Sequence, residues 1–142
     1  LQNAGYKIAV IPESIVYHLG GGTLAYDNSK KTYLNFRNNL FTIFKNETFF
    51  SLLFKLPTRL ILDGIAGLKF LFEGKVQHTL AILKAHFAFY GALFSLIRKR
   101  SSLSKLIQQY RIASPVSASI KSKSILIQYF LLGKRTFREI FN

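Results

Sequence analysis

The sequence contains no cysteine, no methionine and no tryptophan, and only six of its 142 residues are acidic. Without cysteine, a disulfide scaffold, a zinc ribbon and a thiol nucleophile are excluded. No two acids lie within five residues of each other, so there is no local Asp-x-Asp metal motif and no close carboxylate pair. The six acids are Glu13, Asp27, Glu47, Asp63, Glu73 and Glu139.

Apolar and basic residues are what the sequence has in abundance. Apolar residues make up 49%, including 14 Phe, and 20 Lys and Arg give a formal net charge of +14. Such hydrophobicity excludes intrinsic disorder, and the length allows about one domain. The charge indicates a polyanionic partner, either nucleic acid or an anionic membrane surface. Because residues 47–142 carry 15 cations and 4 acids, a net +11, most of the excess lies in the apolar tail, which favours a membrane.

The first 27 residues have the pattern of the end of an α/β domain. Leu1–Ala4 is expected to end a helix, with Gly5 as its stop. Tyr6–Ile11 and Ser14–His18 are two short strand candidates. A flexible glycine turn follows, made of Gly20, Gly21 and Gly22. Because residue 1 is Leu in a helix-like phrase, we expect the chain to be a piece of a longer protein.

Residues 28–100 read as helical throughout. Asn28 or Ser29 is expected to cap a helix that runs to about Lys45. The apolar residues of this helix fall on one face, and Arg37 lies in the middle of that face with Lys30 near it. The buried-face residues are Tyr33, Leu34, Phe36, Leu40, Phe41 and Phe44.

A second helix is expected to start at Pro57 and to end at Gly74. Its charged residues, among them Asp63, share one arc opposite a wide apolar face. The 22 residues Val76–Ile97 would form a helix of about 33 Å, which matches a bilayer core. Because this run contains Lys84 and two histidines, we favour a helix at the membrane interface or packed on a neighbour, with a transmembrane hairpin as the alternative. Leu103–Arg111 is a short helix candidate, and Ile125–Leu132 a second apolar run that Gly133 ends.

Two residues are candidates for binding chemistry. His18 is either a ligand of a metal or diphosphate or a strand-end histidine satisfied by a carbonyl. Arg37 either points inward at a phosphate or carboxylate, with Lys30 and Tyr33 beside it, or covers apolar surface while its head reaches water. His78 and His86 are eight residues apart, which does not match the i, i+4 spacing of helical zinc pairs.

The phrase LQNAGYKIAVIPESIVYHLGGGTL, followed by KKTYLNFRNNLFTIFKN, resembles the end of the catalytic domain of family 2 glycosyltransferases, in particular bacterial enzymes of the rhamnosyltransferase type. In that family a helix ends in a Gly-Tyr/Phe phrase, and a strand ending in His and an aromatic-x-x-Arg-Asn helix follow. Here the latter pattern is Tyr33, Phe36, Arg37 and Asn38. The closing SILIQYFLLGKRTFREI also resembles the tails of such enzymes.

The resemblance implies a GT-A fold and inverting transfer of a sugar from a nucleotide-sugar donor to a saccharide or lipid-linked acceptor in cell-surface polysaccharide synthesis. His18 would face a divalent metal, Mg or Mn, held mainly by residues outside this chain. The donor diphosphate would be bound by Lys30, Tyr33, Arg37, Gly20, Gly21 and Gly22. The catalytic base and the Asp-x-Asp motif would precede Leu1, so no catalytic residue is expected within this chain, and we expect the chain alone to be inactive.

The predicted fold is therefore mostly α, with one or two short strands at the end of a GT-A domain. We expect three segments: 1–46 as the end of the catalytic domain, 47–100 as membrane-associated helices and 101–142 as a basic tail. The expected location is the cytoplasmic face of the inner membrane, peripheral or integral, with no nucleic-acid partner. The main alternative is a noncatalytic, basic, membrane-binding helical module; a nucleic-acid-binding piece is a weaker third reading.

Overall fold

The computed structural model describes residues 2–8, 11–17, 27–112, 127–136 and 138–139. They are mostly helical, as predicted. The chain divides into two compact units, one made of Leu1–Pro12 with Ile107–Asn142 and the other of Glu13–Leu106. The first unit contains the 3-10 helix η1 (Gln2–Ala4) and the short π-helix η2 (Ile127–Leu131).

The two strand candidates have no strand structure in 6–8, 11 and 14–17, the positions of these segments that the structure describes. A strand needs a neighbouring strand to bond its backbone, and the described ranges contain none. The prediction of strands is therefore wrong at these positions. The predicted stop at Gly5 is confirmed, because η1 ends before it and Gly5 has a φ of 87°.

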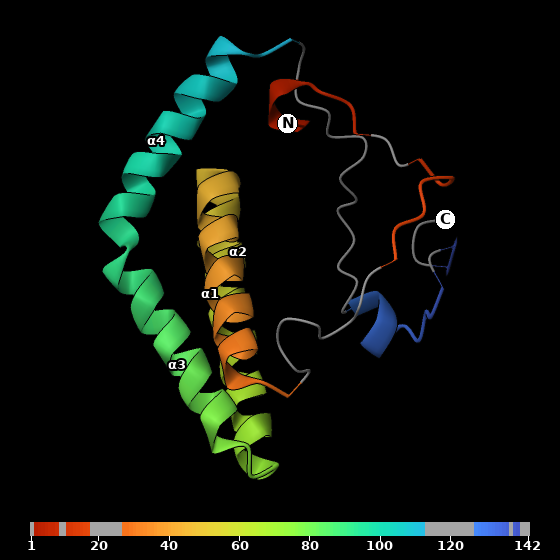
Figure 1. Cartoon of the computed structure of the whole chain (residues 1–142), viewed down its shortest axis with the longest axis vertical. Coiled ribbons are helices and arrows are strands. Elements are labelled where there is room, and N and C mark those ends of the chain that lie inside the picture. Colours follow the sequence, from red (N-terminus) through yellow and green to blue (C-terminus); the bar gives the residue numbers. More distant parts are fainter. Residues whose placement is uncertain (1, 9–10, 18–26, 113–126, 137, 140–142) are drawn as a thin grey trace. The chain divides into compact units, whose positions relative to one another are not determined.

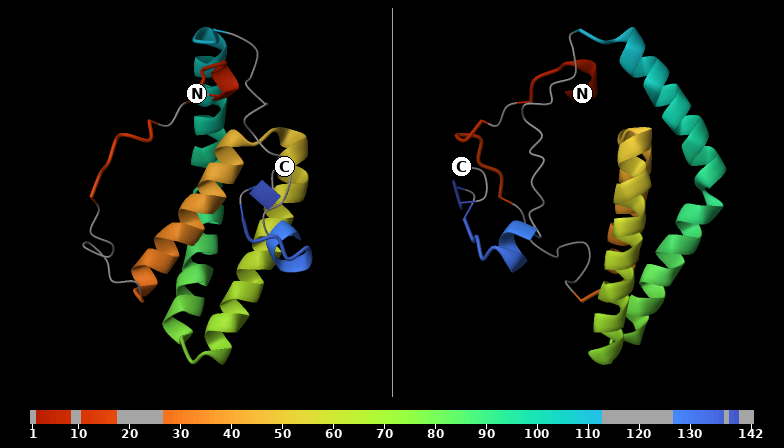
Figure 2. Two further views of the ribbon diagram at one scale, coloured as in Figure 1. Left: turned by 90° about the vertical axis from the view of Figure 1, so that its right-hand side faces the viewer. Right: turned by 180° about the vertical axis from the view of Figure 1, so that it is seen from behind.

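The larger unit is built from three packed helices and part of a fourth: α1 (Ser29–Asn46), α2 (Phe49–Phe72), α3 (Val76–Gly91) and α4 (Leu93–Gln109), of which the last continues into the other unit (Figure 1). Helices α1, α2 and α3 lie side by side and pack pairwise on each other (Figure 2). The helix predicted from residue 28 or 29 to about Lys45 is confirmed, with Asn28 as its cap: the Asn28 Oδ1 accepts from the Lys30 N–H at 2.8 Å.

The core is small and lies where α1 meets α3 and the start of α4. Leu40, Phe89 and Leu96 are its buried centre, and Phe41 and Phe44 pack against it. The Phe89 ring lies 6.2 Å from the Phe41 ring and 5.8 Å from the Phe44 ring, distances typical of aromatic pairs. The apolar face predicted for α1 is thus the face that packs: all six of its members are buried or half-buried.

Helix α2 begins eight residues before the predicted start at Pro57. The Thr48 hydroxyl accepts from the Ser51 N–H at 3.2 Å, which caps the helix at Thr48 instead. Pro57 lies inside the helix, at an exposed position, although an interior proline removes one backbone hydrogen bond. The predicted end is confirmed, since Glu73 is the C-cap and Gly74 has a φ of 73°.

The continuous helix predicted over Val76–Ile97 is also wrong, because the chain bends by 62° between α3 and α4. The break falls at Gly91 and Ala92, and glycine has a low helix propensity. The bend brings Leu96 into the core beside Leu40 and Phe89, so packing compensates for the interrupted helix. The helix predicted over Leu103–Arg111 is the end of α4 rather than a separate element.

No single helix in the described ranges is long and apolar enough to cross a membrane, although α3 and α4 together, bent as they are, meet that criterion of length and composition. Apolar side chains nevertheless cover much of the outside of the larger unit. Six of them on α2 fall within about 60° of each other at about 100° per residue, and each is at least 56% exposed. We call this set the α2 stripe: Phe50, Phe54, Ile61, Ile65, Leu68 and Phe72.

The charged arc predicted for α2 does not face solvent uniformly. Asp63, expected among the exposed charges, is only 1% exposed. Gly67 is buried as well, one turn further along. Helix α2 therefore packs partly through a polar side, while the α2 stripe is left exposed.

Candidate binding site

Three of the predicted donor-binding residues lie along the first half of α1. Lys30 is the second residue of the helix, and Tyr33 and Arg37 come one and two turns later. The Arg37 Nη1 lies 3.5 Å from the Tyr33 hydroxyl oxygen, so the structure brings these two side chains together. His18 and the glycines Gly20, Gly21 and Gly22 lie outside the described residues.

Arg37 is half-buried on the apolar face, as its position in the helix predicted. Its guanidinium lies over the rings of Tyr33 and Phe41, 5.2 and 5.7 Å from the ring centres. Its Nε and Nη2 donate to the Asn38 Oδ1 at 3.2 and 3.0 Å. Aromatic faces and an amide oxygen thus hold the Arg37 charge locally, and the guanidinium lies against the apolar surface of its own helix.

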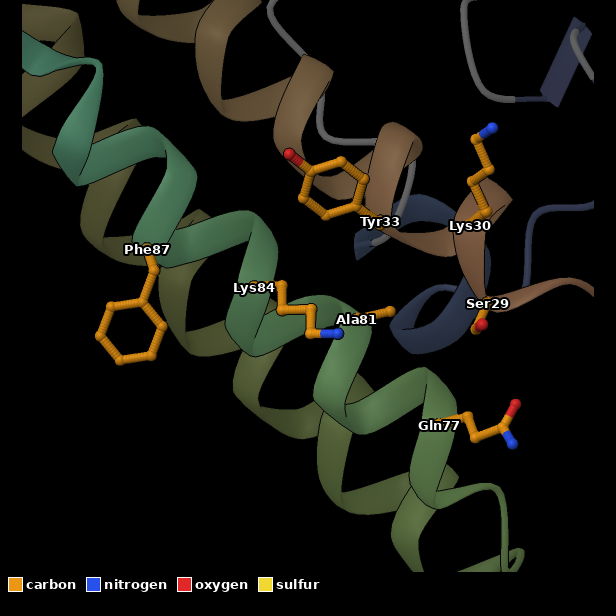
Figure 3. A pocket seen from close by; sticks show the side chains of 7 residues that line it. All are labelled: Ser29, Lys30, Tyr33, Gln77, Ala81, Lys84 and Phe87. Atoms are coloured by element: carbon orange, nitrogen blue, oxygen red, sulfur yellow. The ribbon is translucent and has the colours of Figure 1, made fainter.

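A pocket of about 540 Å³ lies between the start of α1 and the middle of α3 (Figure 3). Lys30 and Tyr33 line it from α1, and Lys84 lines it from α3, with Ser29, Gln77, Ala81 and Phe87 completing the wall. Figure 3 shows the Lys30 side chain extending away from α3. Apart from Lys30, the lining residues carry the Lys84 ammonium, a hydroxyl, a phenol and an amide, but no carboxylate, so the electrostatics of the pocket suit an anionic group such as a phosphate.

Near the start of α1, the side chains of Thr32, His78 and Asp27 lie in contact in that order. The His78 Nε2 lies 3.0 Å from the Asp27 Oδ1, and the Thr32 hydroxyl lies 2.7 Å from the His78 Nδ1. The His78 ring also stacks on Phe70 at 5.0 Å. The same order of groups activates nucleophiles in hydrolases, but none of the three side chains lines the pocket beside it. We interpret these three side chains as a structural contact that holds the start of α1 against α3.

A second carboxylate–histidine pair is buried between α2 and α3. The His86 Nε2 lies 3.1 Å from the Asp63 Oδ2, and the Arg59 Nε lies 2.8 Å from the Asp63 Oδ1. The Arg59 Nε has no partner of hydrogen-bond geometry, so that contact is an ion pair rather than an aligned hydrogen bond. The Arg59 guanidinium also lies over the Phe36 ring, 5.2 Å from its centre. We call Arg59, Asp63 and His86 the buried charge cluster.

The sequence offered only a faint signal for these clusters. Arg59 and Asp63 have the i, i+4 spacing of a helical ion pair, but this spacing usually marks an exposed face. His86 is 23 residues from Asp63, and nothing local indicates that they meet. No group of three or more His, Asp or Glu suited to a metal ion occurs within the described part of the chain.

Comparisons with protein-family models, with curated proteins and with solved structures find no match to this chain.

Proposed function

We propose that this chain is the C-terminal, membrane-facing part of an inverting glycosyltransferase at the cytoplasmic face of the inner membrane. The observation that carries the membrane part is the α2 stripe. Monomeric soluble proteins rarely expose large contiguous apolar patches, and such patches mark interaction or membrane surfaces. The stripe runs along most of a 24-residue helix and continues onto α3, where Leu80, Leu83 and Phe87 are also exposed.

Cations beside the apolar surface favour an anionic lipid surface as its partner. On α2, Lys55 and Lys69 lie near the stripe, but they pair with Glu47 at 2.6 Å and with Glu73 at 3.7 Å, so the unbalanced positive charge comes from α4. On α4, Arg98 and Lys99 are exposed next to the exposed Phe94. Basic residues near a membrane surface contribute about 1 kcal/mol each to binding anionic lipids.

The transferase part of the proposal rests on the resemblance of residues 1–46 to the end of a family 2 catalytic domain. The pocket between α1 and α3 supports it, because Lys30 and Tyr33 line that pocket and both belong to the residues proposed to bind the donor diphosphate. Arg37 contacts Tyr33 and would complete this side of the donor site. His18 and a divalent metal would act with residues of the complete protein.

Sedimentation with vesicles tests the membrane part. The chain should bind vesicles of phosphatidylcholine with phosphatidylglycerol, and 0.5 M salt should weaken this binding because exposed charges are screened. The triple variant Phe54→Gln/Ile65→Gln/Phe72→Gln should lose most of the binding while it stays folded, since these side chains are already exposed. Binding that ignores both lipid charge and the triple variant would overturn the proposal.

The matched control for that variant is Ile15→Gln/Val16→Gln. These two side chains are also exposed and apolar but lie outside the helices. If the control lost as much vesicle binding as the α2 variant, the surface responsible would not be the α2 stripe.

The complete protein tests the transferase part. Arg37→Ala should raise the KM for the nucleotide-sugar donor roughly tenfold or more, the cost of a charged hydrogen bond. Asn39→Ala, on the exposed side of the same helix, is the control and should leave the KM unchanged. An unchanged donor KM in Arg37→Ala, Lys30→Ala and His18→Ala together would favour the alternative, a noncatalytic membrane-binding module.

A further inference from the structure

A second pocket, of about 450 Å³, lies between α2 and α3 and falls within the size range of small-molecule sites. Its walls are mostly apolar, but two members of the buried charge cluster line it as well. The lining residues are Leu60, Asp63, Gly64, Gly67, Leu68, Thr79, Ile82, Leu83, His86 and Tyr90.

The hydrogen bonds around this pocket leave one ring nitrogen of His86 unused. The Asp63 carboxylate accepts hydrogen bonds, so the contact at 3.1 Å places the proton on the His86 Nε2. In the neutral imidazole Nδ1 then carries a lone pair, and no side chain or backbone group in the described ranges donates to it. The Thr79 hydroxyl is already used, because it donates to the Gly67 carbonyl at 2.9 Å.

The charges of the cluster indicate what kind of ligand fits. Arg59 and Asp63 form an ion pair, so with a neutral imidazole the cluster has no net charge. An anionic head group would approach the Asp63 carboxylate, and a cationic one would compete with Arg59 for it; either would be unfavourable in an apolar pocket. An uncharged hydroxyl, in contrast, donates one hydrogen bond and needs no counter-ion.

We propose that this pocket binds an uncharged amphiphile of the membrane, such as a monoacylglycerol, whose hydroxyl donates to the His86 Nδ1. Its alkyl chain lies against Leu60, Leu68 and Leu83. Leu68 belongs to the α2 stripe and is 56% exposed, and Leu83 is 48% exposed, so the pocket shares residues with the surface assigned to the bilayer. In this respect the inference rests on the proposed membrane face.

The test titrates the whole chain with decan-1-ol, decane and decanoate in buffer without vesicles. Decan-1-ol should bind saturably, shift the ¹⁵N resonance of the His86 Nδ1, and bind at least tenfold more tightly than decane or decanoate. His86→Phe should remove that preference for the alcohol. Equal affinity for decan-1-ol and decane, or tighter binding of decanoate, would overturn the assignment of an uncharged hydroxyl ligand.

Gly64→Leu keeps the test decisive if His86→Phe fails to fold. A Cβ at Gly64 meets nothing within 4 Å, so a side chain added there begins in open space at the pocket wall, and Leu also has a higher helix propensity. This variant should melt at the same or a higher temperature and lose decan-1-ol binding. Thr58→Leu is the control, because Thr58 is an exposed residue of the same helix that lies outside the pocket, and it should bind normally. Undiminished decan-1-ol binding by Gly64→Leu would refute the site.

The two proposals fail separately. Gly64→Leu should still sediment with anionic vesicles, because the α2 stripe is unchanged. If the chain binds decan-1-ol through His86 but sediments with no vesicle, the membrane face is wrong and the hydroxyl site stands with a soluble ligand. If it sediments but binds no decan-1-ol, the pocket proposal is wrong.

Discussion

Helix α3 carries two histidines eight residues apart, and each meets an aspartate in a different environment. His78 pairs with Asp27, whose side chain is 70% exposed, and His86 pairs with Asp63, which is 1% exposed. Water screens the His78–Asp27 pair, so the attraction between these two groups contributes little to stability. The Asp63 carboxylate is removed from water, and Arg59 is needed to balance its charge. The two pairs thus differ in their carboxylates rather than in their imidazoles: His78 is itself buried, at 8% exposure, but its partner Asp27 is open to water, whereas Asp63 is enclosed.

The largest difference should appear when each carboxylate is removed. Asp63→Ala leaves the Arg59 charge without a partner, and we expect a loss of about 3 kcal/mol in the free energy of unfolding, at the low end for buried pairs. The low end applies because the Arg59 side chain keeps 26% of its exposure. Urea unfolding followed by circular dichroism measures the change.

The control for this variant replaces the ion pair as a whole. Arg59→Met/Asp63→Leu removes both charges together, and apolar replacements of buried pairs are often neutral in stability. The double variant should therefore recover most of the loss seen in Asp63→Ala. A double variant as unstable as Asp63→Ala would mean that the loss comes from packing rather than from an unpaired charge.

Asp27→Ala should have a smaller effect, below about 1 kcal/mol, as for exposed ion pairs. It removes the partner of the His78 Nε2 but leaves the Thr32 hydroxyl and the Phe70 ring in contact with the imidazole. The same urea titration, repeated at 0.5 M salt, should shrink the difference between wild type and variant. A loss as large as that of Asp63→Ala would contradict the assignment of this pair to the screened surface.

The smallest effect concerns Glu47, whose exposure lies between those of the two aspartates. Burial alone would raise the pKa of Glu47, but hydrogen bonds from Lys55 and Ser51, together with the Lys55 charge, lower it below its ordinary value of 4.5. The Lys55 Nζ lies 2.6 Å from the Glu47 Oε1, and the Ser51 hydroxyl lies 2.7 Å from Oε2. Because the folded chain binds this proton more weakly than the unfolded chain, the stabilisation is complete above pH 4.5 and is lost as the pH falls through the lower, folded pKa.

Urea unfolding of wild type and Glu47→Gln between pH 6 and pH 2.5 measures this contribution. The difference between the two should be below about 1 kcal/mol at pH 6 and should vanish at the acidic end. A constant difference across the range would show that the Glu47 charge is not its source.

Some of these features followed from local sequence. The apolar face of α1 follows from its periodicity, Asn28 from its preference for helix caps, and the end of α2 from Gly74, because each depends on residues within a turn or two. The start of α2 did not follow from local sequence, because the Thr48 cap overrides the helix-start signal of Pro57. The break after Gly91 did not follow either, because it depends on the packing of Leu96 in the core, whereas the local hydrophobicity indicates one continuous helix. For the candidate site, spacing on α1 placed Tyr33 beside Arg37, but Lys84 and Gln77 join the pocket from α3 only through the tertiary fold.

The sequence by itself determined that the chain is helical, basic and too apolar to be disordered, because composition and periodicity act locally. Only the tertiary structure decided which side of α2 is inside. Asp63 packs inward because two other helices supply partners for its ion pair. Phe36 of α1 lies under the Arg59 guanidinium, and His86 of α3 lies beside the Asp63 carboxylate. Both partners are too distant in the sequence to be predicted from local patterns. Once those partners neutralise the charge, the polar side of α2 becomes the interior and its apolar stripe is left outside.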